Sequence, residues 1–127
     1  MRINRTGEGR FSIKLTPPQA AVIEECLTLA AGSGGSDEMS QFNLGEAAYV
    51  VAATASTMRE SRNSDLSKEL ALSMQQLHGV YASLACAATE FVSDEDFHQR
   101  TGWYRENVIG LAREISRAMR SLVADEA

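Results

Sequence analysis

The chain reads LALSMQQLHGVYASLACAATEF over residues 70–91 and FHQRTGWYRENVIGLAREISRAMRSL over residues 97–122. In both stretches apolar residues recur at alternating steps of four and three. A repeat that averages about 3.5 residues places its members on one narrow face of a helix. Because the gap between the stretches is short, they predict two long helices packed antiparallel. The first stripe is Leu70, Met74, Leu77, Tyr81, Leu84, Ala88 and Phe91, and the second is Phe97, Thr101, Tyr104, Val108, Leu111, Ile115, Ala118 and Leu122.

Two further helices are expected upstream. Thr16 and Gln19 form a capping box around Pro17, which needs no amide partner in a first helical turn, so a helix should begin here and end at Gly32. Asn43, three residues before Glu46, favours the start of the next helix. That helix is alanine-rich and apolar on nearly all sides, which predicts a central position.

A short extended segment precedes these helices. Phe11, Ile13 and Leu15 alternate with polar residues, the period of a half-buried strand. One strand cannot form a sheet alone, so we expect it either to pair with the same strand of another subunit or to lie across the helices. Residues 1–10 are expected to form a flexible arm, and the Gly- and Ser-rich residues 32–42 a flexible loop. The sequence therefore predicts one all-α domain, residues 1–127, with about four helices and a single N-terminal strand.

Composition narrows the classes of function. The chain has 127 residues and a net charge of −5, and 44% of its residues are apolar, which fits one ordinary globular domain. The arginines near the C-terminus are interleaved with glutamates, so nucleic-acid binding is disfavoured. No signal sequence and no apolar run of about 20 residues is visible, which predicts a cytoplasmic protein that does not enter a membrane. Cys26 and Cys86 are expected to be buried, reduced thiols.

Candidate residues for chemistry are few. His78 and His98 are the only histidines, and no nucleophile or second base accompanies His78 at a fixed spacing. Asp94 and His98 lie four residues apart on one helical face, with Asp96 and Glu90 nearby. The acids already suit the first turn of a helix, however, and one histidine with exposed carboxylates is a weak ligand set for a metal. The glycine-rich loop has no lysine to hold a phosphate. We therefore expect no enzyme activity, no cofactor and no metal.

Four residues near the C-terminus suggest an interaction surface instead. Trp, Tyr and Arg are the residue types that most often contribute strongly to protein interfaces. Trp103, Tyr104, Arg100 and Arg105 cluster in this way and are our candidate partner-binding residues. The alternative interpretation is that Trp103 fills the end of the helical bundle.

The sequence thus favours a small cytoplasmic regulatory or adaptor protein, expected to be a homodimer, that binds another protein; an antagonist of a transcription regulator is one such role. The alternative function is binding of a small ligand in a pocket between the second and third helices. The residues expected to line that pocket are Tyr49, Met74, His78 and Tyr81.

Overall fold

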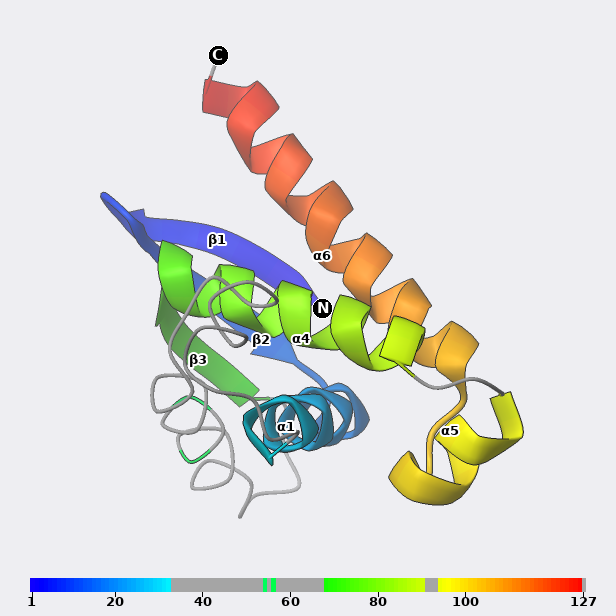
Figure 1. Cartoon of the computed structure of the whole chain (residues 1–127). Helices are drawn as coiled ribbons and strands as arrows, with labels where there is room; N and C mark the ends of the chain where they lie inside the picture. The colour runs from blue at the N-terminus through cyan, green and yellow to red at the C-terminus, as the bar shows by residue number, and fades with distance from the viewer. Residues whose placement is uncertain (33–53, 55, 57–67, 91–93, 127) are drawn as a thin grey trace.

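The computed structural model describes residues 1–32, 54, 56, 68–90 and 94–126. These residues form three strands and four helices (Figure 1). In chain order the elements are β1 (Arg2–Gly7), β2 (Arg10–Leu15), α1 (Pro17–Gly32), β3 (Lys68–Ser73), α4 (Met74–Glu90), α5 (Asp94–Thr101) and α6 (Arg105–Glu126).

The strands form an antiparallel sheet in the order β1-β2-β3. Ile13 at the centre of β2 is opposite Ile3 on one side and Leu70 on the other. The protein is therefore α+β, and the expectation of an all-α helical bundle is wrong.

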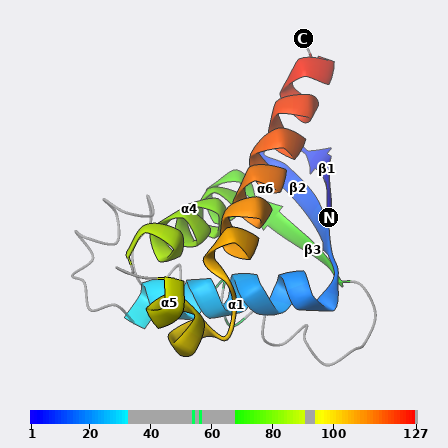
Figure 2. The same cartoon turned by 90° about the vertical axis from the view of Figure 1, so that its right-hand side faces the viewer.

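Helices α1, α4 and α6 cover one face of this sheet (Figure 2). The apolar strand residues on that face are buried, and they join the helices in one hydrophobic core. The opposite face carries polar residues, among them the exposed Arg2, Asn4 and Lys14. On that face the Ser12 hydroxyl donates a hydrogen bond to Glu69 Oε1 at 2.6 Å. The largest fully buried side chains are Phe11, Phe97, Ile13, Leu15, Ile23, Leu27, Leu72, Leu84, Ile115, Val80 and Val108.

Strand β3 occupies residues that the heptad pattern assigned to a helix. Leu70 and Leu72 are buried while Glu69 and Ala71 are exposed, which is the alternation of a strand. The helix begins only at Met74, where a capping box starts it. The amide of Ser73 donates to Gln76 Oε1 at 2.9 Å, and the amide of Gln76 donates to Ser73 Oγ at 3.1 Å.

Residues 2–7, expected to be part of a flexible arm, form strand β1 instead. β1 and β2 are joined by a tight turn in which Gly9 has a φ of 67°, a conformation that glycine adopts without strain. β2 is consequently paired on both sides within one chain. Pairing of this strand between subunits, which was a reason to expect a homodimer, is thereby removed.

Helix α1 confirms the prediction made from its capping box. The amide of Thr16 donates to Gln19 Oε1 at 3.0 Å, and the amide of Gln19 donates to Thr16 Oγ1 at 3.3 Å. The helix ends at Gly32, as expected. The expected loop beyond Gly32, and the helix expected from Asn43, lie outside the described residues apart from two isolated positions.

The last expected helix is divided in two. Gly102 has a φ of 79°, which ends α5 and allows the chain to turn into α6. α6 packs against α4, as the two stripes predict, but its C-terminal half extends away from α4 (Figure 1). This divergence leaves an open space between the two helices.

Candidate functional site

A groove lies between the first two turns of α4 and the C-terminal half of α6. Its volume is about 570 Å³, within the range of roughly 300–1,000 Å³ that is common for ligand pockets. We call it the α4–α6 groove. Its lining residues are Met74, Leu77, His78, Tyr81, Ile115, Ser116, Met119, Arg120, Val123 and Ala124.

The groove has a buried apolar floor and an exposed apolar rim. Leu77 and Ile115 are each 2% exposed. Met74, Tyr81 and Val123 are 46%, 38% and 58% exposed, although all three are large and largely apolar. Within the described residues these are three of the four exposed large hydrophobic side chains, so exposed apolar surface is concentrated here.

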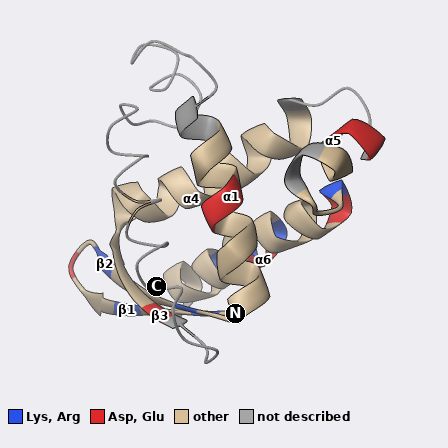
Figure 3. Cartoon of the chain, turned by 90° about the horizontal axis from the view of Figure 1, so that it is seen from below, with Lys and Arg blue, Asp and Glu red and all other residues tan. Residues whose placement is uncertain are grey.

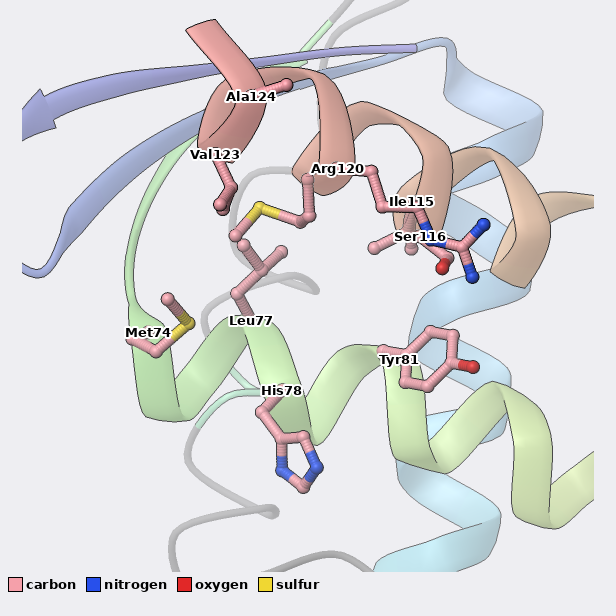
Figure 4. Close-up of a pocket in the computed structure, with 10 residues that line it drawn as sticks. Met74, Leu77, His78, Tyr81, Ile115, Ser116, Arg120, Val123 and Ala124 are labelled. Carbon is pink, nitrogen blue, oxygen red and sulfur yellow. The ribbon is translucent and has the colours of Figure 1, made fainter. Parts of the chain in front are cut away.

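The two ends of the groove differ in polarity (Figure 4). Met74 and Val123 face each other at one end. At the other end the Tyr81 ring lies on the same side as the Ser116 hydroxyl and the Arg120 guanidinium. An occupant of the groove therefore meets apolar side chains at one end and hydrogen-bond donors with a positive charge at the other.

Three of the four residues predicted to line a ligand pocket lie at this groove, namely Met74, His78 and Tyr81. Among the described residues the opposite wall is α6, and the second predicted helix lies outside the described residues apart from positions 54 and 56. Tyr49 lies outside the described residues. The His78 ring points away from the α6 side chains in Figure 4, so His78 belongs to the outer edge.

Sequence reasoning missed the α6 side of the groove. Met119 and Val123 lie beside the heptad stripe and not in it, so the stripe alone assigns them no contact. The signal that was present is the width of the apolar face of α6, which Met119 and Val123 extend beyond Ile115 and Leu122.

The predicted partner-binding residues are divided between the interior and the surface. Trp103 is half-buried and packs against the hydrophobic core, whereas Tyr104 is 58% exposed. The Tyr104 ring stacks on the His98 ring, with centroids 4.3 Å apart, and His98 Nδ1 lies 3.4 Å from the Trp103 carbonyl oxygen. The Arg105 guanidinium lies over the Phe97 ring, 5.9 Å from its centroid. The side chain of Arg100 lies outside the described residues.

Replacing Trp103 with alanine should lower the free energy of unfolding by about 1 to 3 kcal/mol, less than for a fully buried tryptophan, because part of the side chain already contacts water. Urea titration measures the change. Tyr104→Ala is the matched control and should cost less than about 1 kcal/mol, the scale of its stacking on His98. Equal stability of the two variants would contradict the packing of Trp103 on the core.

The groups available for catalysis are limited. Burial, with a smaller contribution from the charge of Glu25, raises the pKa of the Cys26 thiol to about 12, so this thiol stays protonated and unreactive at neutral pH. Both cysteines are free thiols. Among the described residues, no group of three or more His, Cys, Asp or Glu side chains is placed to hold a metal ion. In the same part of the chain, no helix has the length and apolar character needed to cross a membrane.

Comparison with known proteins gives no relative: no family model, curated protein or solved structure matches this chain.

Proposed function

We propose that this protein is a small regulatory or adaptor protein that binds another protein through the α4–α6 groove. The observation that carries the proposal is the exposed apolar rim formed by Met74, Tyr81 and Val123 above the buried floor. Contiguous apolar surface that remains exposed on a globular domain is typical of interaction sites. Binding there would cover the partner's apolar segment and withhold it from other contacts.

Two methionines make the groove suitable for a protein segment. Met74 and Met119 lie on opposite walls, one on α4 and one on α6. Methionine side chains are unbranched and polarisable, so they adapt to differently shaped apolar side chains. A groove between two helices also matches the mode in which an amphipathic helix binds with its apolar face down.

The proposal includes a cytoplasmic location. Cys26 and Cys86 are both free, and cysteines persist as thiols in reducing compartments. Self-association remains part of the proposal on the strength of the exposed apolar rim alone. Sedimentation at micromolar concentration tests it, since a dimer has twice the monomer mass.

Affinity capture from the source cells tests partner binding. The wild-type chain should retain one stoichiometric protein, and Met74→Arg and Val123→Arg should each lose it. The introduced charge would have to be desolvated in an apolar contact, which costs free energy and weakens binding. Both positions are exposed, so the variants should fold. The matched control is Tyr104→Arg, which changes an exposed large side chain outside the groove and should retain the partner. A partner that all four proteins retain would show that the groove is not the contact.

Binding of a small ligand is the second candidate function, and the volume of about 570 Å³ is the observation that favours it. A ligand at 100 times its Kd should raise stability by about 2.7 kcal/mol through mass action. A thermal-shift screen against metabolites detects this effect. A hit that is lost in Val123→Arg would favour the ligand over the protein partner.

A further inference from the structure

Three arginines form a stripe along α6 beside the groove. Arg113, Arg117 and Arg120 follow one another at steps of four and three, so they share one helical face. All three are exposed, and Arg120 lines the α4–α6 groove. None of the three forms a hydrogen bond or ion pair in the described part of the chain. We call these residues the arginine stripe.

The other wall of the groove carries no charge. From Met74 to Thr89, α4 contains no Lys, Arg, Asp or Glu, whereas blue segments mark the arginines along α6 (Figure 3). The chain as a whole has a net charge of −5. From Arg113 to Arg120, α6 carries three arginines and one glutamate, the exposed Glu114, so the net charge of this segment is +2. This edge is positive on an otherwise acidic protein, and it favours an occupant whose negative charges lie on the α6 side.

The length of the groove fits about two to three turns of helix. On α6 the lining residues run from Ile115 to Ala124, about 14 Å at a rise of 1.5 Å per residue. Apolar anchors at positions i, i+3 or i+4, and i+7 of an amphipathic helix span about 10 Å. The arginine stripe begins before Ile115 and continues alongside the groove, so it offers a row of charges parallel to such a helix.

We infer that the segment bound in the α4–α6 groove is an acidic amphipathic helix of a partner protein, with its apolar side chains in the groove and its carboxylates along the arginine stripe. The inference rests on the proposed function and specifies the chemistry of the partner. A row of carboxylates matches three arginines, whereas a single anionic head group would engage only the one that lines the groove, Arg120. Charge at the rim sets the choice of partner and the rate of association more than the affinity.

Selection from a displayed library of 18-residue helical peptides tests the inference. The full chain is the bait. Peptides that also bind the Met74→Arg/Val123→Arg double variant are discarded, because they bind outside the groove. Peptides that depend on the groove should have a net negative charge concentrated beside their apolar face. The tightest of them is then synthesised with a fluorescent label, and its affinity is measured by anisotropy.

Charge reversal identifies the contact. The triple variant Arg113→Glu/Arg117→Glu/Arg120→Glu should bind the labelled peptide with about tenfold lower affinity, since three exposed ion pairs become repulsive. The loss of affinity should be smaller at high salt. The matched control, Arg2→Glu/Arg10→Glu/Lys14→Glu, makes the same change in net charge at exposed positions of the β1–β2 hairpin. It should weaken binding less than about threefold. Circular dichroism checks that both variants are folded.

The outcomes separate this inference from the proposed function. Groove-dependent peptides that are neutral or basic would overturn the acidic partner and leave groove binding supported. No groove-dependent peptide at all would overturn both. Dodecanoate could displace the peptide at micromolar concentration, and Arg120→Glu alone could abolish that displacement. This result would identify an anionic amphiphile, and not an acidic helix, as the occupant of the groove. Self-association that Val123→Arg abolishes would make a second copy of the chain the occupant.

Discussion

Replacing Phe11 with alanine should lower the free energy of unfolding by about 3 to 5 kcal/mol. Phe11 is completely buried in the central strand, and its position opposite Leu72 places it on the face that the helices cover. Its ring also lies 4.9 Å from the guanidinium carbon of Arg5, which closes one side of it. The alanine variant loses this contact area and leaves a cavity in the middle of the sheet. Urea titration followed by circular dichroism measures the effect.

Lys14→Ala is the matched control for Phe11→Ala. Lys14 lies on the same strand three residues away, but on the exposed face of the sheet. Its replacement should change stability by less than about 0.5 kcal/mol. If Phe11→Ala costs less than about 1 kcal/mol, β2 is a peripheral segment and not the centre of the core. That result would contradict the central place of Phe11 in the core between the sheet and the helices.

Local signals in the sequence predicted local structure well. The capping box at Thr16 and Gln19 fixed the start of α1, because its two hydrogen bonds connect residues only three apart. The alternation of Phe11, Ile13 and Leu15 likewise predicted a strand. The capping box is sufficient because its contacts lie within the first turn of the helix, whereas the alternation predicts a strand without specifying the strands that pair with it.

The predicted fold class, all-α, was wrong because the periodicity of a helix and that of a strand overlap near Leu70. Leu70 and Met74 are four residues apart, so a heptad count continues through them, although Leu70 and Leu72 also fit the period of a strand. Ser73 and Gln76 mark the boundary, and this capping box was overlooked. The partner of β3 is β2, more than fifty residues earlier, and no local pattern specifies pairing at that separation.

The candidate site was predictable only in part for a related reason. The sequence identified Met74 and Tyr81 as members of an apolar face, but a groove forms only where two packed helices diverge. That point is set by the direction in which α6 leaves Gly102, which no residue pattern specifies. The α6 wall of the groove was therefore missed, and so was the placement of Arg120 and Tyr81 at the same, polar end of the groove.

The heptad stripe also assigned equal burial to two aromatic residues that the structure separates, and this gives the last prediction. Phe97 and Tyr104 are seven residues apart, yet Phe97 is fully buried and Tyr104 is 58% exposed, because Gly102 breaks the helix between them. Phe97→Ala should therefore lower the free energy of unfolding by about 3 to 5 kcal/mol, since α5 has no other fully buried large side chain among its described residues.

Tyr104→Ala should cost less than about 1 kcal/mol, the scale of its stacking on His98. Urea titration of the two variants side by side measures the difference. A continuous helix through residue 102 would keep both aromatic rings on one face and make the two losses similar. Similar losses would thus contradict the break at Gly102, and with it the direction of α6 that opens the α4–α6 groove.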